Sequence, residues 1–375
     1  MVSSPIISER CFHQLSFGLS SIFPSWMTSS NSLKSLGRLC GALSDSGISL
    51  CLPSLSGQII MPLFSMSMSF SRTITSCTDL FGTLRCRITF IMGNGSARFT
   101  MTAVMEGPGL WLIGLGPGDL RHMTSFALSV AEACDKRYLE GYTAILPDDQ
   151  EEKLGDLVGD WSRVMREDIE NPVEIIRQAK NVMVGIMVVG DPMQATTHID
   201  LKIRCQESGV PFHVVPGLSA TSLAVSLSGM QSYRFGRQVT IPFPYGDYLP
   251  TSPLEIILKN YSNNLHTLVL LDLDPTGMGS SPPEPMVPKQ AYEILKAMAE
   301  RYGEYAEEGN ESLSSSISDW NVILLSDIGT SGQRVVSGSL SGISEFAGGM
   351  IHCLILPTEF SGMEREIFES LKADM

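Results

Sequence analysis

The chain has 375 residues, of which 43% are hydrophobic and 18% are charged, and its formal net charge is −14. This length and composition are typical of a globular protein with two or three domains and a buried core. The acidic balance repels phosphate backbones, so we expect no nucleic acid partner, and the absence of an apolar run of about 18 residues predicts no membrane span.

Residues 1–104 differ in composition from the rest of the chain. They hold seven basic and three acidic residues, a net charge of about +4, whereas the remainder carries about −18. The segment is rich in serine and shows neither helical periodicity nor strand alternation. Three explanations are open: an organelle transit peptide, a disordered tail, or an upstream extension outside the natural product. We favour the third, with translation starting at Met105, and expect residues 1–104 to be disordered or not part of the natural product.

The main body begins with the stretch LWLIGLGPGDL, residues 110–120. An apolar run that ends in clustered glycines predicts a strand followed by a turn that faces a ligand. A helix over 124–135 and a strand over 136–143 would complete a β-turn-α-β unit. The glycine spacing is not that of a dinucleotide fingerprint, although Glu140 could serve as its acid. A turn without any ligand is a further alternative.

A second unit is centred on VMVGIMVV, residues 182–189, a continuous apolar run typical of a buried parallel strand. It ends at Gly190-Asp191-Pro192, where open α/β sheets bind ligands. The Asp191 side chain could cap the following helix or accept hydrogen bonds from a ligand. A helix over 197–207, a strand over 211–215 and a helix of small residues from PGLSAT to about Gly229 are predicted next.

The second half of the chain predicts a further set of alternating elements. Strands are expected at 238–241, 266–273, 322–326 and 351–356, and helices near 253–260, 289–302 and 364–373. Residues 274–288 are too rich in proline and glycine to form an element. The fold class is therefore α/β, with two domains at 105–230 and 231–375.

Several kinds of active site lack their motifs in this sequence. There is no P-loop and no G-x-S-x-G nucleophile motif. The eight cysteines form no C-x-x-C pair and the six histidines no pair at metal spacing, so we expect no metal site. The few cysteines of the body indicate a reduced, intracellular protein. Among the histidines, His352 is the main candidate for a functional role because it lies at the start of a predicted strand.

The segments GLGPGD, VVGDP and VVPGLSA, in this order, resemble the tetrapyrrole methylase superfamily of S-adenosylmethionine-dependent methyltransferases. Further segments narrow the resemblance to the diphthine synthase family, over about residues 107–360: LEGYTA, REDIE, GDPMQATTHIDLKIR, YRFG, PTSPLEII, LHTLVLLDLD and IHCLILP. The resemblance implies two α/β domains with the cofactor bound in the cleft between them.

The resemblance also implies an activity. Methyl groups would pass from S-adenosylmethionine to the amino group of a 3-amino-3-carboxypropyl-modified histidine of translation elongation factor 2, in a cytoplasmic homodimer. No catalytic acid is required, because the sulfonium is already an activated electrophile and positioning supplies most of the rate. Eight residues are implied to bind the cofactor: Pro117, Asp191, Gln194, Ala220, Thr221, Leu271, Ile328 and His352. Two alternatives stay open, a precorrin or uroporphyrinogen methylase and an elongation-factor-binding module without catalysis.

Overall fold

A computed structural model describes the backbone of residues 69–79, 82–93, 96–246, 248–279, 282–305 and 316–372. Within these ranges it describes the side chains of residues 107–303 and of residues 316–372. The chain divides into two compact units, Met1–Gly107 and Pro108–Met375. The expectations for residues 1–68 lie outside the described residues. None of the described helices is long and apolar enough to span a bilayer.

The described part of the first unit is an antiparallel sheet of three strands in the order β1-β2-β3. Its strands are β1 (Ser69–Asp79), β2 (Gly82–Gly93) and β3 (Ser96–Glu106). Sequence analysis found no strand alternation here, and the structure differs because β-branched and aromatic residues are frequent enough to favour strands. The dipeptide Asn94-Gly95 between β2 and β3 is typical of hairpins and is the signal that was missed. Translation from Met105 stays a prediction.

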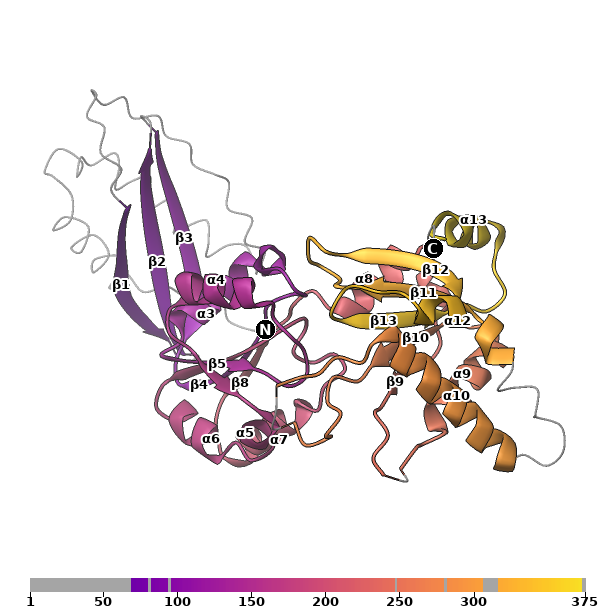
Figure 1. The fold of residues 1–375 in the computed structure, drawn as a ribbon. Helices are drawn as coiled ribbons and strands as arrows, with labels where there is room; N and C mark the ends of the chain where they lie inside the picture. The colour runs from indigo at the N-terminus through magenta and orange to yellow at the C-terminus, as the bar shows by residue number, and fades with distance from the viewer. Residues whose placement is uncertain are drawn as a thin grey trace, which may run out of the picture. The chain divides into compact units, whose positions relative to one another are not determined.

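The second unit contains two sheets, and the first of them is fully parallel with the strand order β6-β5-β7-β4-β8. Its strands β4, β5 and β8 are labelled in Figure 1. The apolar runs that predicted strands are its central members, in which every residue is buried. The strands are β4 (Gly109–Gly114), β5 (Lys136–Glu140), β6 (Ser162–Val164), β7 (Met183–Val188) and β8 (Phe212–Val215).

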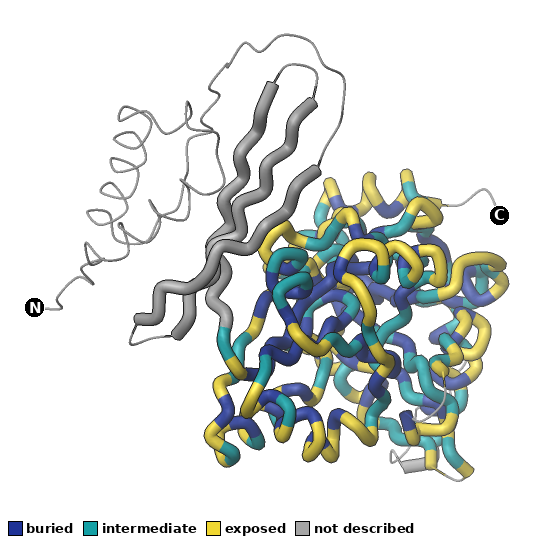
Figure 2. The backbone as a smooth tube through the Cα atoms, turned by 90° about the vertical axis from the view of Figure 1, so that its left-hand side faces the viewer, coloured by how far each residue is buried: buried dark blue, intermediate teal, exposed yellow. Residues whose placement is uncertain are grey.

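Helices cover both faces of this sheet, as a parallel sheet requires. One face is covered by α3 (Ser125–Ala133), beside which lies α4 (Asp148–Val158). The other face packs against α5 (Arg166–Glu170), α6 (Val173–Ala179) and α7 (Ile199–Glu207). Figure 2 shows buried segments of the second unit in its interior and exposed segments at its surface. The predicted α/β fold class is confirmed.

The second sheet is mixed and has the order β12-β11-β13-β10-β9. Only β9 and β10 pair in parallel, whereas the other neighbours are antiparallel. Its strands are β9 (Val239–Ile241), β10 (Thr267–Leu271), β11 (Asn321–Ser326), β12 (Arg334–Ser339) and β13 (His352–Leu356).

Two groups of helices enclose this second sheet. Its larger apolar cluster lies against α9 (Ser252–Ser262), α10 (Pro288–Tyr305) and α12 (Leu340–Ser344). The other face contacts α8 (Ala220–Ser228) and α13 (Gly362–Ser370) through residues such as Ala224 and Phe368. Helix α8 follows the first sheet in the chain but packs on the second. The predicted domain boundary at residue 230 stays a prediction.

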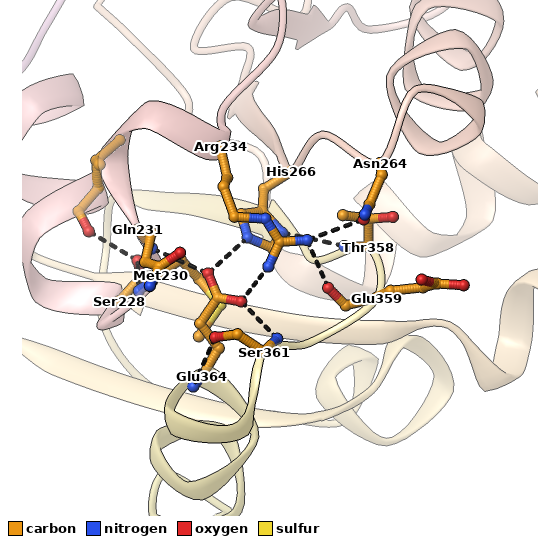
Figure 3. A network of polar contacts seen from close by, with 11 residues as sticks. Ser228, Met230, Gln231, Arg234, Asn264, His266, Thr358, Glu359, Ser361 and Glu364 are labelled. Carbon is orange, nitrogen blue, oxygen red and sulfur yellow. Dashed lines mark hydrogen bonds and ion pairs between the residues drawn. The ribbon is translucent and has the colours of Figure 1, made fainter.

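A buried polar network joins α13 to the second sheet (Figure 3). The Glu364 carboxylate accepts hydrogen bonds from the Arg234 guanidinium and from Nε2 of His266, the latter at 3.0 Å. Nδ1 of His266 accepts the backbone N–H of Thr358 at 3.1 Å, so the ring proton must lie on Nε2. The network therefore fixes one tautomer of a fully buried histidine.

Candidate functional site

A cavity of about 580 Å³ opens at the carboxyl ends of the first sheet's strands. Its lining residues follow all five of those strands, and the second sheet adds residues at β9, β10, β11 and β13. These segments are 117–119, 142–150, 166, 189–196 and 219–221 from the first sheet and 240, 270–273, 325–331 and 350–353 from the second, with gaps in several of them. The volume lies in the range of sites for small ligands and cofactors.

The glycine turn after β4 forms one wall of this cavity. Gly116 has a φ of 77°, which favours glycine, and it forms a two-way backbone bridge with Gly190 after β7, with N···O distances of 3.2 and 2.9 Å. Pro117 then lies against the second sheet's loop, where Gly329 approaches its carbonyl. The turn therefore lines the cavity and is also hydrogen-bonded to the neighbouring loop of its own sheet.

Asp191 connects the loops that follow β7 and β8. One carboxylate oxygen accepts the backbone N–H of Met193 at 2.9 Å, and the other accepts the backbone N–H of Gly217 at 3.1 Å. The following helix α7 begins after His198 and has no side-chain cap bond, so the capping role offered for Asp191 is wrong. The remaining lone pairs of the carboxylate can still accept hydrogen bonds from a ligand.

A fully buried histidine supports the Asp191–Thr197 loop. His198 Nδ1 lies 2.8 Å from the carbonyl oxygen of Pro192, to which it donates a hydrogen bond. Burial lowers the pKa of His198, so the ring stays neutral with its proton on Nδ1. Gln194 and Ala195, which is held at a φ of 56°, line the cavity from this loop.

The second sheet contributes a polar edge at β11 and β13. His352 Nδ1 lies 2.7 Å from the Ser326 hydroxyl, and burial lowers the pKa of this histidine. The Asp327 carboxylate accepts the backbone N–H groups of Met350 and Ile351, both at 2.9 Å. These bonds hold the loops after β11 and before β13 together at the mouth of the cavity.

The structure brings all of the predicted site residues to this one cavity. They are Pro117, Asp191, Gln194, Ala220, Thr221, Leu271, Ile328 and His352. Their role in binding a cofactor stays a prediction. Sequence analysis assigned no role to Tyr142 and Arg166, which also line the cavity, although both lie in segments that carried the family resemblance.

The dinucleotide alternative rested on Glu140, and the structure does not favour it. Glu140 is 1% exposed and is not among the lining residues. Its carboxylate accepts hydrogen bonds from the backbone N–H groups of Tyr142 and Thr143 and from the Thr143 hydroxyl, so its oxygens shape the loop after β5. Burial raises the pKa of Glu140. Among the described residues, no group of three or more potential metal ligands lies together.

The comparisons with known proteins agree with one another. The family of tetrapyrrole (corrin/porphyrin) methylases matches residues 109–344. A diphthine synthase of Methanoregula boonei is 34% identical over 68% of this chain and 96% of its own length, and one of Methanocaldococcus jannaschii is 31% identical over 70% and 98%. A crystal structure of a diphthine synthase is similar with a TM-score of 0.60 and 26% identity, over 70% of this chain and 95% of that one.

Proposed function

This chain belongs to the diphthine synthase family of tetrapyrrole methylases, which makes it an S-adenosylmethionine-dependent methyltransferase of diphthamide biosynthesis, and we propose that it methylates elongation factor 2. The acceptor would be the amino group of the 3-amino-3-carboxypropyl-modified histidine. The observation that carries this proposal is that every residue implied to bind the cofactor lines one cavity between the two sheets.

The lining of the cavity fits S-adenosylmethionine. Its wall combines apolar side chains such as Leu271 and Ile328, small residues at the start of α8, and five carboxylates against one guanidinium. An excess of carboxylates favours a cationic sulfonium, and the small residues leave room for an adenosine group. Pro117, Asp191 and Gln194 would hold the cofactor from the first sheet, together with Ala220 and Thr221, and Leu271, Ile328 and His352 would hold it from the second.

The residues of this site would act mainly by position. S-adenosylmethionine, when bound, supplies a methyl group on a positively charged sulfur. The loops after β4, β7 and β8 are joined by hydrogen bonds at Gly116, Asp191 and Gly217, so they present a rigid wall. A rigid wall can hold an amine in line with the methyl group and exclude water, which accounts for most of the rate in such a transfer.

Methyl incorporation distinguishes the proposed function from its alternatives. Purified protein is expected to transfer labelled methyl groups to elongation factor 2 that carries the 3-amino-3-carboxypropyl group, and not to unmodified elongation factor 2. Transfer to a precorrin or uroporphyrinogen alone would identify a tetrapyrrole methylase. Binding of elongation factor 2 without any transfer would identify a module that has lost catalysis.

Replacement of Asp191 by alanine is expected to weaken S-adenosylmethionine binding by about 1.5–3 kcal/mol, the size of a lost charged hydrogen bond. The variant also frees the loops after β7 and β8 from each other. Isothermal titration calorimetry measures the change. Asp200→Ala is the matched control, because Asp200 is half exposed on α7 and pairs with Arg204. Equal affinity in wild type and Asp191→Ala would remove Asp191 from the site.

We also propose that the protein is a cytoplasmic homodimer. The apolar side chains of Ile199 and Ile203, one turn apart on α7, are 53% and 50% exposed, which supports a surface that a second copy covers. A molar mass of one chain by light scattering would contradict the dimer.

A further inference from the structure

The cavity extends beyond the residues implied to bind the cofactor. From the first sheet, those residues follow β4, β7 and β8, which are neighbours in the strand order β6-β5-β7-β4-β8. The cavity wall also includes residues that follow β5 and β6 at the other edge, among them Tyr142, Thr143 and Arg166. This second part of the cavity is therefore available to the molecule that accepts the methyl group.

The electrostatics of this second part depend on one cation. Arg166 is the one lysine or arginine among the described residues that line the cavity. The described lining also contains five carboxylates, those of Asp119, Asp149, Asp191, Asp272 and Asp327. Each of the five accepts a hydrogen bond from its own surroundings. None of these hydrogen bonds involves Arg166, and no ion pair joins Arg166 to a carboxylate among the described residues. Its charge acts on the buried Glu140 carboxylate only electrostatically, without a hydrogen bond.

The contacts of Arg166 hold its guanidinium in place and leave most of its donors free. The guanidinium lies over the Tyr142 ring, 5.3 Å from the ring centre, and one terminal nitrogen donates to the carbonyl of Gly277 at 3.3 Å. Nε is buried and has no hydrogen-bond partner among the described residues. Arginine has five N–H donors, and a buried donor without an acceptor costs free energy. The terminal N–H groups that do not donate to Gly277 can donate to an anionic oxygen of a ligand.

We propose that Arg166 binds the carboxylate of the aminocarboxypropyl group on the acceptor histidine. The inference rests on the proposed function, because that function supplies an acceptor with a carboxylate. In this group, the carboxylate and the reacting amine are attached to the same carbon atom. A guanidinium binds a carboxylate through paired hydrogen bonds with defined geometry. Binding of the carboxylate to Arg166 therefore restricts the position of the amine relative to the cofactor half of the cavity.

A purely structural role for Arg166 makes different predictions. The residue connects β6 to the loop after β10, because its backbone N–H donates to the carbonyl of Gly279 at 3.2 Å. A side chain at position 279 would clash with the Arg166 side chain, so the glycine permits this close contact. If Arg166 served only to join these segments, its replacement would lower stability and cofactor affinity without a specific effect on the acceptor.

Steady-state kinetics with modified elongation factor 2 separate these roles. Arg166→Gln is expected to raise KM for the acceptor about 10- to 100-fold, the effect of losing a charged hydrogen-bonded pair. The affinity for S-adenosylmethionine and the melting temperature should stay at the wild-type values. Arg166→Lys keeps the charge without the planar fork and should raise KM less. Arg177→Gln, which removes a 67% exposed arginine on α6, is the control.

The outcomes of this experiment distinguish a failure of the Arg166 assignment from a failure of the proposed function. An unchanged KM in Arg166→Gln overturns the assignment of Arg166, as does an equal effect of glutamine and lysine. A variant that unfolds or loses affinity for S-adenosylmethionine has lost a structural residue, which also overturns it. If the wild-type protein transfers no methyl group to modified elongation factor 2, the proposed function fails, and the assignment of Arg166 fails with it.

Discussion

Replacement of Gly217 by alanine is expected to lower methyl transfer by about 100-fold and to destabilise the protein by about 3 kcal/mol, the upper end of the usual cost of overpacking. Three loops meet at this residue. A Cβ atom at position 217 would lie 2.1 Å from the carbonyl oxygen of Gly190 and 2.9 Å from Cα of Gly114. Both neighbours are backbone atoms, so no side chain can rotate to make room and the loops must separate.

The loops that would separate are those that carry the implied cofactor residues. The N–H of Gly217 donates to Asp191, and the helix with Ala220 and Thr221 begins three residues later. Labelled methyl transfer and urea unfolding measure the two effects. Gly362→Ala is the control, because a Cβ there meets no atom within 4 Å. Near-wild-type turnover in Gly217→Ala would mean that the three loops do not need this close packing.

Most of the two sheets could be predicted from the sequence because buried strands are continuous apolar runs. The predicted strand over 182–189 is β7 (Met183–Val188), and that over 322–326 is β11 (Asn321–Ser326). The proline- and glycine-rich stretch 274–288 contains no strand or helix among its described residues before α10 begins at Pro288. In these regions local composition and burial point to the same structure.

The missed elements are short or polar. Strand β6 has three residues, two of them exposed, and α4 is strongly acidic, so neither has the apolar pattern of a core element. Strand β12 has the sequence RVVSGS and depends on its antiparallel pairing with β11. Tertiary contacts, which no local window contains, specify these segments.

In the site, too, residues that follow a local sequence pattern could be predicted, whereas contacts between residues far apart in the chain could not. The turn at Gly116 and the acid at Asp191 are visible in the sequence because each follows a buried apolar strand. The pairing of Asp191 with Gly217 joins residues 26 positions apart, and Arg166 meets a loop more than 100 positions away. Prediction of such contacts requires the order of the strands in the sheet, and the sequence pattern does not specify that order. The partners of a polar residue were therefore the part that sequence reasoning could not supply.

Replacement of Glu364 by alanine is expected to destabilise the protein by about 3–5 kcal/mol, the cost of breaking a buried ion pair from one side. Glu364 is 1% exposed. Its removal leaves the Arg234 guanidinium, 16% exposed, without its carboxylate and leaves Nε2–H of buried His266 without an acceptor (Figure 3). The backbone N–H groups of Gln231 and Ser361 lose their acceptor as well.

Urea unfolding at neutral pH measures this loss, and a neighbouring glutamate on the same helix provides the control. Glu369 pairs with Lys372, and both side chains are 51% exposed. Exposed pairs contribute about 0–1 kcal/mol, so Glu369→Ala should stay within about 1 kcal/mol of wild type. A similar loss of unfolding free energy in the two variants would show that the buried network contributes no more stability than an exposed charge pair.

The pH dependence of the Glu364→Ala effect tests its electrostatic origin. Burial raises the pKa of Glu364, but hydrogen bonds from the backbone of Ser361 and Gln231 and from His266 lower it more, to about 2. A carboxyl whose pKa is lower in the folded state contributes stability above its ordinary value of 4.5 and loses it as the pH falls towards 2. The difference between wild type and variant should therefore be full at neutral pH and narrow below about pH 4.5. A difference that persists unchanged in acid would assign the loss to the cavity left by the side chain, since a cavity does not titrate.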